Sequence, residues 1–256
     1  MRLFFLTALA ALAQSDHAAW DALLKKYVTA ESRVHYAQWK ADGASALDAY
    51  LAQGPGASKA ALINAYNAHM IRWILANYPT ASAFRTDDPF RAARNQVNGR
   101  EMSLDDIETE LRNMGDPRIH AALVCAARSC PPLRREAYTE SAIDAQLDDN
   151  TRQWLANPTL NEFGATSKVS PIFDWYAGDF RDLDGFLARY SGHKPGAKIE
   201  FKTYDWTLND SDPNTPHYPQ WRFYIDAFGY QPSWVRASAA ALLLLAAYAL
   251  KRRFIY

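Results

Sequence analysis

Apolar positions along the chain recur mainly at helical spacing. The clearest pattern runs from Lys59 to Asn77, where apolar side chains occupy nearly the whole circumference of a helix. Ser58 precedes this segment as an N-cap, and Pro79 follows it as a stop signal. We therefore predict a central, buried helix over 59–77.

Further segments show weaker patterns of the same kinds. Apolar stripes with period 3.6 predict helices over 17–29, 45–52, 103–114, 138–157 and 183–190, with Ser103 and Thr139 as N-caps. Asn98-Gly99 predicts a hairpin turn, and alternation from Lys198 to Trp206 predicts a late strand. The fold class that follows is α+β: a helix-rich single domain around a small, mostly antiparallel sheet, plus a C-terminal hydrophobic helix.

The N-terminus has the pattern of a signal peptide over residues 1–13. Arg2 precedes the apolar run LFFLTALAALA, and Ala11-Leu12-Ala13 fits the A-x-A cleavage pattern. The alternatives are an uncleaved anchor, because the positively charged region is short, and an ordinary buried helix. A signal peptide or an anchor directs the rest of the chain out of the cytoplasm, to the periplasm or the extracellular face.

A second apolar run extends from Ala237 to Leu250 and precedes Lys251-Arg252-Arg253. As a helix this run rises about 21 Å, less than the roughly 30 Å of a bilayer core, but extension back to Ser233 approaches that length. We predict a transmembrane helix over 233–250 and a basic cytoplasmic tail over 251–256. A buried or partner-binding helix is the alternative.

The part of the chain between these runs divides into a domain over 14–210 and a polar, proline-bearing linker over 211–232. Lys and Arg together number 28, as do Asp and Glu. Since the chain has neither net positive charge nor a long basic block, we expect no nucleic-acid partner. Apolar and aromatic residues make up 49% of the sequence, enough for one sizeable core.

Asp116 to Leu133 is the segment richest in candidate chemistry, because it holds both cysteines, Cys125 and Cys130, together with His120. An apolar run before Cys125 predicts a short buried strand. Alternation along a strand would place His120 and Cys125 on opposite faces, which makes His69 of the 59–77 helix a rival partner for the thiol. In an oxidising compartment the two cysteines can instead form a disulfide.

A thiol beside an imidazole is the minimum needed for nucleophilic attack on a carbonyl carbon. The sequence offers either cysteine as nucleophile, His120 or His69 as base, and an orienting group among Glu108, Asp116 and Asn67. The alternative for Asn64, Asn67 and His69 is a structural role, in which their hydrogen bonds tie neighbouring loops to the helix.

The same cysteines and histidines can in principle hold zinc, but paired Cys-x2-Cys or His-x3-His spacing is missing. We therefore predict neither a metal nor another cofactor. Four arginines around the central segment are candidates for binding a carboxylate or phosphate, with solvated surface arginine as the alternative: Arg118, Arg128, Arg134 and Arg135.

Four segments together resemble the family of domain of unknown function 547 (DUF547) over about Trp20 to Asn209. They read LINAYNAHMI, SLDDIETELR, DPRIHAALVCAARSCPPL followed by AYT, and YDWTLND. The resemblance implies an α+β domain with a distant likeness to papain- and transglutaminase-type cysteine enzymes. It implies no established activity.

By position, the resemblance assigns Asn64, Tyr66 and Asn67 to the N-x-Y-N helix of the family and Glu108 to its I-E acid. His120 and Cys125 match H-x-A-L-x-C, and Ser129, Cys130 and Pro131 match S-C-P. The chain departs from the family at Ala121, where Phe is usual, and at Ala126, where Gly is frequent. A small neighbour beside His120 would widen a pocket, so the substrate stays open.

We therefore expect an exported, membrane-anchored protein with a Cys–His site for an amide, a peptide or a thiol-containing small molecule. Cys125 would be the nucleophile, His120 the base, and Glu108 and Asn67 its orienting partners, with His69 as the rival base. The alternative is a non-catalytic domain that binds a peptide or small anionic ligand. Its candidate ligand-binding residues are Asn64, Tyr66, Arg118, Arg128, Ser129 and Cys130. The oligomeric state is left open.

Overall fold

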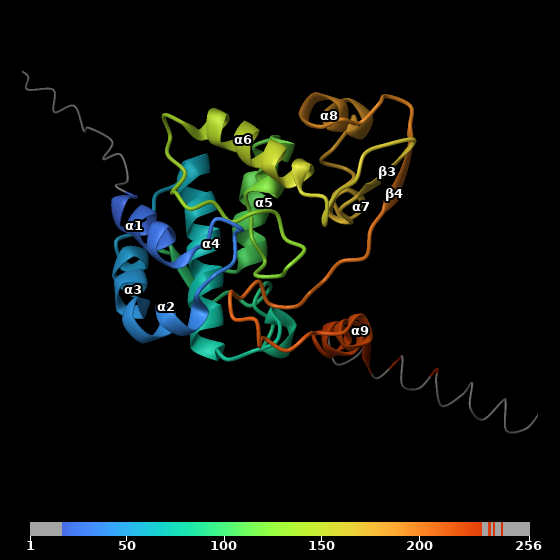
Figure 1. Cartoon of the computed structure of the whole chain (residues 1–256). Helices are drawn as coiled ribbons and strands as arrows, with labels where there is room; N and C mark the ends of the chain where they lie inside the picture. Colours follow the sequence, from blue (N-terminus) through green and yellow to red (C-terminus); the bar gives the residue numbers. More distant parts are fainter. Residues whose placement is uncertain (1–16, 232–234, 237, 239–241, 243–256) are drawn as a thin grey trace, which may run out of the picture.

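Helix α4 (Lys59–Asn77) is the centre of the fold, as Figure 1 shows. The structure is a computed structural model, and it describes residues 17–231, 235, 236, 238 and 242. Every residue from 60 to 71 is buried. Ser58 Oγ accepts a hydrogen bond from the Ala61 N–H, which is the predicted N-cap. The predicted central helix is thus confirmed.

Three helices precede α4 in the chain: α1 (Ala18–Tyr27), α2 (Tyr36–Asp42) and α3 (Ala44–Ala52). Helices α2 and α3 pack against α4, and α1 packs against α2 and α3. Their shared core is aromatic. The Trp39 ring lies 4.8 Å from that of Tyr27, and the Trp20 ring lies 5.8 Å from that of Tyr50. Stacked rings bury a large apolar area at defined angles, which fixes these three helices against one another.

The predicted hairpin and the helix after it are also confirmed. Strands β1 (Asn95–Val97) and β2 (Arg100–Met102) pair antiparallel. Asn98 and Gly99 have φ values of 53° and 75°, as a tight turn between twisted strands requires. Helix α5 (Leu104–Asn113) then starts with a complete capping box between Ser103 and Asp106.

A short helix, η1 (Ala83–Arg85), lies between α4 and β1, and α5 is followed by η2 (Pro117–Ala121), α6 (Ile143–Ala156), β3 (Thr166–Val169), α7 (Ile172–Trp175), α8 (Leu183–Tyr190) and β4 (Lys198–Phe201). The helix-rich α+β class is confirmed, but the single, mostly antiparallel sheet is wrong. The described residues form two separate strand pairs, and β3 and β4 are parallel. A parallel pair needs a long crossover, which α7 and α8 supply.

Two predicted boundaries differ, and for the first of them side chains hydrogen-bond the backbone where the helix was expected to begin. The helix expected from 138 begins only at Ile143, and Thr139 is not its cap. The Asn64 amide bonds both the N–H and the C=O of Tyr138, and Gln146 Oε1 accepts from the Thr139 N–H. The late strand ends at Phe201, after which the chain leaves β3.

The strand predicted between His120 and Cys125 is wrong. Residues 117–121 form the short helix η2, with Pro117 in its first turn and Asp116 Oδ1 accepting from the Arg118 N–H. Beyond η2, the Asn67 side chain bonds the Ala122 C=O and the Val124 N–H. The Asn67 side chain thus forms the hydrogen bonds that a neighbouring strand would otherwise form with these backbone groups, so residues 122–124 do not form a strand. The expected alternation of side chains between two faces of a strand therefore does not apply.

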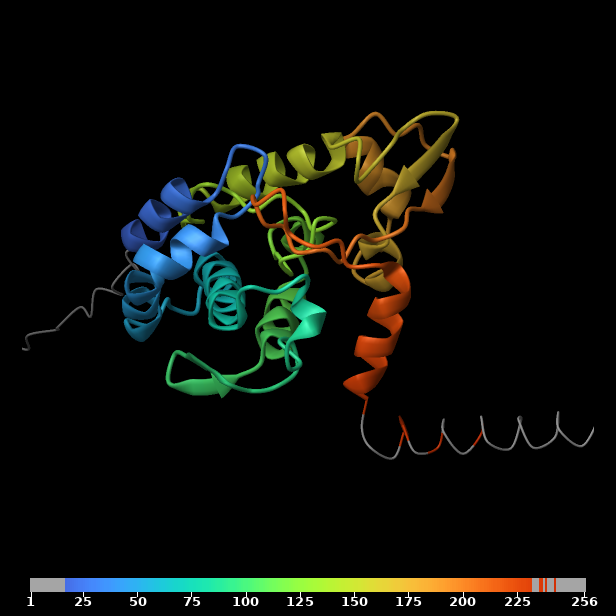
Figure 2. The same ribbon diagram turned by 60° about the horizontal axis from the view of Figure 1, so that its bottom comes forward.

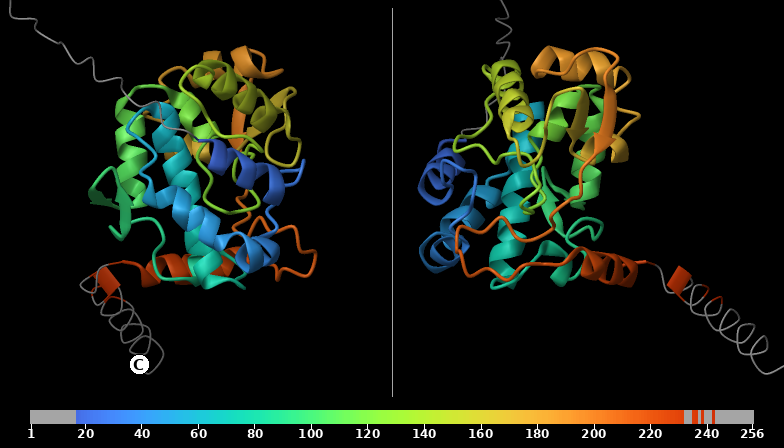
Figure 3. Two further views of the ribbon diagram at one scale, coloured as in Figure 1. Left: turned by 90° about the vertical axis from the view of Figure 1, so that its left-hand side faces the viewer. Right: turned by 45° about the vertical axis from the view of Figure 1, so that its right-hand side comes forward.

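The range predicted as a linker contains helix α9 (Gln220–Gly229). Figure 2 shows α9 standing out from the body of the molecule, and Figure 3 shows the chain before it crossing to the side of α2. Within the described ranges, no helix combines the length and apolar character needed to cross a bilayer. The predicted signal peptide (1–13), basic tail (251–256) and most of the 233–250 segment lie outside the described residues.

Candidate functional site

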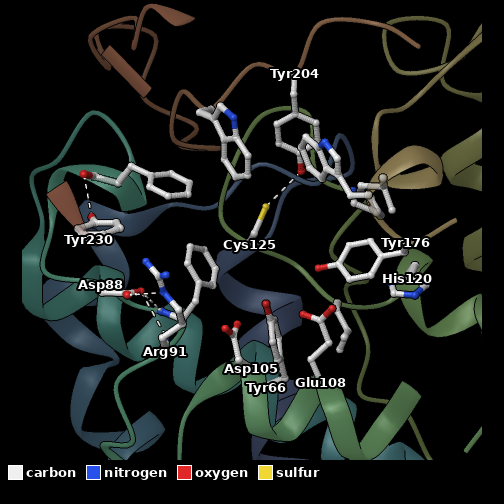
Figure 4. Close-up of a pocket in the computed structure, with 17 residues that line it drawn as sticks. Tyr66, Asp88, Arg91, Asp105, Glu108, His120, Cys125, Tyr176, Tyr204 and Tyr230 are labelled. Carbon is white, nitrogen blue, oxygen red and sulfur yellow. Dashed lines mark hydrogen bonds and ion pairs between the residues drawn. The ribbon is translucent and has the colours of Figure 1, made fainter. Parts of the chain in front are cut away.

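A cavity of about 310 Å³ lies between α5, η2 and the segments around residues 84–91, 172–176 and 204–206. Figure 4 shows polar side chains from several elements pointing into it. Its polar lining consists of Asp88, Arg91, Asp105, Glu108, His120 and Cys125. Most of the remaining wall is aromatic: Tyr66, Phe84, Phe90, Trp175, Tyr176, Tyr204, Trp206 and Tyr230.

The aromatic wall is built as a stack. The Trp206 ring lies nearly parallel to those of Trp175 and Phe223, at centroid distances of 5.7 and 4.8 Å and interplanar angles of 10°. Tyr204 packs beside it at 4.4 Å. Phe223 belongs to α9, so this helix supports the wall from behind. Flat aromatic faces of this kind hold apolar groups and cations.

The acidic side of the cavity comes from α5. Asp105 and Glu108 are one turn apart and therefore share a helix face. Glu108 is 9% exposed, whereas Asp105 lies more openly. Burial raises the pKa of Glu108, and a hydrogen bond from the Tyr176 hydroxyl lowers it less. Among the described residues, no Lys or Arg forms an ion pair with either carboxylate, and Arg91 is paired with Asp88 at 2.7 Å.

His120 is held by a chain of charged partners at the edge of the cavity. Its Nε2 lies 2.8 Å from Asp179 Oδ2, and Arg112 Nε lies 2.6 Å from the same oxygen. The Arg112 hydrogen bond lowers the pKa of Asp179, and burial lowers the pKa of His120. A neutral imidazole must then donate its Nε2–H to the carboxylate, which leaves Nδ1 as the basic nitrogen.

Cys125 and Cys130 form a disulfide with an S–S distance of 2.23 Å. The Tyr204 hydroxyl lies 3.2 Å from Cys125 Sγ and 3.4 Å from Cys130 Sγ, and it is the donor because disulfide sulfur carries no proton. Ala126 has a φ of 60°, in the left-handed region, where the segment turns. His120 and Cys125 thus line one cavity without a hydrogen bond between them. In the disulfide state Cys125 has no thiolate to attack with.

Asn64 and Asn67 of α4 do not face this cavity. Asn64 bonds the backbone of Tyr138, and Asn67 bonds the backbone on either side of Leu123. Each amide therefore replaces a backbone partner for a buried loop. The interpretation that these residues tie loops to the helix is confirmed for Asn64 and Asn67, and the Asn67 side chain hydrogen-bonds backbone groups rather than His120.

The structure separates the other predicted residues. His69 lines a different cavity with Trp73 and Asn95, and burial lowers its pKa to about 4. Arg118 is bound by three carboxylates, those of Asp116, Asp144 and Asp148. Ser129 Oγ accepts from the Asp205 N–H, and Arg128 and Cys130 line a cavity on the other side of the disulfide. Of the predicted set, only Tyr66, Glu108, His120 and Cys125 line the aromatic cavity.

Several lining residues were missed by the sequence reasoning. Asp105 was detectable, since it precedes Glu108 by one helical turn, and Tyr204 and Trp206 stand in the quoted YDWTLND segment. Tyr176 and Asp179 gave no such signal. They reach the site only because the chain folds back after β3.

A hydroxyl–imidazole–carboxylate chain elsewhere in the structure is structural. Ser167 Oγ lies 2.8 Å from His193 Nδ1, and His193 Nε2 lies 2.7 Å from Asp184 Oδ1. Ser167 is fully buried, so a substrate has no access to its hydroxyl. In the part of the chain that the structure describes, no group of three or more His, Cys, Asp or Glu side chains is placed to hold a metal ion.

Residues 55–155 match the family model described as "Protein of unknown function, DUF547". The matched range contains α4, α5, η2 and the disulfide segment, so the resemblance seen in the motifs is confirmed there. Tyr176, Asp179, Tyr204 and the whole of α9 lie beyond it. No curated protein and no solved structure matches the chain.

Proposed function

We propose that this chain, whose residues 55–155 form a DUF547 domain, binds a small organic cation with an apolar body. The observation that carries the proposal is Glu108: a buried carboxylate that faces a wall of aromatic rings and, among the described residues, forms no ion pair. A ligand ammonium would pair with Glu108 while its apolar body lies against Trp175 and Trp206.

Electrostatics supports a cation rather than a neutral ligand. An ionised carboxylate loses hydration when buried and regains that energy only through hydrogen bonds or an opposite charge. Tyr176 supplies one hydrogen bond to Glu108, and the Arg112 charge lowers the Glu108 pKa less than burial raises it, but among the described residues no Lys or Arg lies within ion-pair distance. The volume of about 310 Å³ is at the lower end of the range of about 300–1,000 Å³ for ligand pockets. A single aromatic ring with a short amine chain fits this description.

A series of ligands that differ only in charge tests the proposal. Tryptophan fluorescence would follow the binding of 2-phenylethylamine, 2-phenylethanol and 3-phenylpropanoate at pH 7. We expect the amine to bind at least about tenfold more tightly than the alcohol, equivalent to about 1.4 kcal/mol, and the acid to bind most weakly. Glu108→Gln should abolish the preference for the amine. Equal affinity for all three compounds would exclude a cation site.

A cysteine enzyme is the second candidate, and the His120–Asp179 pair favours it, because a neutral imidazole held by a carboxylate is a competent base. This activity would require a dithiol to donate two electrons and reduce the disulfide, releasing Cys125 as a thiol. Iodoacetamide should then alkylate Cys125 of the reduced protein below the usual thiol pKa of about 8.5, and more slowly in His120→Ala. Alkylation that His120→Ala leaves unchanged would rule out the pair.

We also propose that the protein is exported and attached to a membrane, with α9 at the membrane surface. Trp221, Tyr224, Ile225 and Phe228 are 61%, 64%, 55% and 44% exposed. Their spacing puts them on one face of α9, opposite Phe223, which packs on the cavity wall. An exposed aromatic and aliphatic helix face is typical of interfacial helices. The apolar run 237–250 that follows, and the signal-like N-terminus, support the same placement.

A further inference from the structure

A second cavity, of about 200 Å³, lies behind the disulfide segment. Cys130 lines this cavity and Cys125 lines the aromatic one, while Pro131 lines both. The short disulfide segment is therefore a partition between two cavities. The proposed cation site accounts for one of them and makes no use of the other.

Backbone pairing brings two arginines to the second cavity. The Val34 N–H donates to the Asn209 C=O at 3.0 Å, and the Arg128 N–H donates to the Thr207 C=O at 2.8 Å. The segments around 34 and 127 thus flank the segment 207–210, although they are far apart in sequence. Both Arg33 and Arg128 line the cavity between them.

Among the described residues, these two guanidinium groups lack the carboxylate partners that Arg118 and Arg134 have. Arg118 and Arg134 each meet at least two carboxylates. Among the residues that the structure describes, neither Arg33 nor Arg128 forms an ion pair, and the buried Nε of Arg128 has no hydrogen-bond partner. Burial, and then the Arg128 charge, lower the pKa of Arg33.

Two carboxylates lie near Arg33 and Arg128 but form no ion pair with either guanidinium group. Glu31 lines the cavity, but it is exposed. Asp205 raises the pKa of Arg33, less than burial and Arg128 lower it, and its Oδ1 accepts from the Thr207 N–H. Two like charges held in a partly buried cavity repel each other, and that repulsion is relieved when an anion binds between them.

We propose that Arg33 and Arg128 form an oxyanion site that takes a carboxylate or phosphate group. Guanidinium groups bind both kinds of anion through paired, charge-assisted hydrogen bonds, and the unpartnered Arg128 Nε is one such donor. The site is opposite in charge to the proposed cation cavity and lies on the other side of the disulfide. The proposed anion site can therefore be tested, and can fail, independently of the proposed cation site.

Isothermal titration calorimetry of the full chain with inorganic phosphate and with acetate, at constant ionic strength and pH 7, tests the site. We expect saturable binding of at least one of the two, with a dissociation constant of about 1 mM or tighter. Their relative affinity identifies the preferred anion. Arg33→Gln and Arg128→Gln should each weaken binding at least about tenfold. Arg128→Lys, which keeps the charge but loses the planar fork, should fall between wild type and Arg128→Gln.

Arg135→Gln is the matched control, because Arg135 is exposed, donates to the Lys25 C=O and lies outside this cavity. It should bind like wild type. Wild-type protein that takes up neither anion would overturn the proposal, as would equal weakening by Arg135→Gln, which indicates general charge screening. If a glutamine variant fails to fold, Arg33→Lys and Arg128→Lys decide: wild-type affinity in both contradicts a bidentate site.

Discussion

The buried Glu108 carboxylate, which is proposed to bind a cation, also lowers the stability of the ligand-free protein at neutral pH. Burial raises its pKa above the ordinary 4.5, so the folded protein holds this proton more tightly than the unfolded chain does. The free energy of unfolding therefore decreases as pH rises from about 4.5 through the raised pKa of the folded state. At neutral pH, the ionised Glu108 destabilises the ligand-free protein.

Glu108→Gln should consequently stabilise the ligand-free protein. Glutamine keeps an acceptor for the Tyr176 hydroxyl but carries no charge to bury. We expect its free energy of unfolding to exceed that of wild type by about 1 kcal/mol at pH 7, and the two to converge below about pH 4, as measured by urea unfolding. Glu101→Gln, at an exposed position of β2, should show no such divergence. A variant that is less stable at pH 7 contradicts the account.

Other residues show which roles a sequence pattern can predict. Asn64 and Asn67 are polar positions in an apolar helix, and their pairing with loop backbone follows from the need to satisfy buried groups. The hydrogen-bond partners of His120 and Cys125 could not be predicted in this way. Asp179 and Tyr204 lie 59 and 79 residues further along the chain. Local periodicity carries no information about such distant contacts.

Among the elements, α9 carries the proposed membrane contact. If its exposed face enters the interface, Trp221 should lie about 5–10 Å below the headgroups. Vesicles with brominated acyl chains should then quench part of the tryptophan fluorescence of the full chain. We expect Trp221→Phe to reduce the quenched fraction. Trp175→Phe, which removes a comparably exposed tryptophan of the cavity wall, should leave that fraction nearly unchanged. If Trp221→Phe has no effect, α9 does not enter the membrane.

The elements also show where periodicity succeeds and where it fails. Helix α4, the β1–β2 hairpin and the capped start of α5 follow from local signals, because the caps, the turn residues and the apolar periodicity that specify them lie within each segment. The apolar run before Cys125 predicts a strand, but a short apolar run is equally compatible with a buried helix or loop. The Asp116 side chain caps η2. The Asn67 amide, which reaches this segment across 55 residues of sequence, holds the residues after η2 as a loop.

At the scale of the whole molecule, one short disulfide segment separates two cavities of opposite character. On the Cys125 side are aromatic rings and Glu108, and on the Cys130 side are Arg33 and Arg128. Helix α9 supports the aromatic wall through Phe223 and presents its other face to solvent. The helix-rich α+β class was predictable from sequence. The two cavities were not, because they form where segments distant in sequence meet.

A crystal structure of the disulfide-intact protein with 2-phenylethylamine tests the central claim most directly. We predict the ligand in the aromatic cavity, with its ammonium nitrogen about 2.7–3.2 Å from a Glu108 carboxylate oxygen and its ring against Trp175 or Trp206. A ligand that occupies another site, or one that lies in this cavity with its ammonium turned away from Glu108, would contradict it.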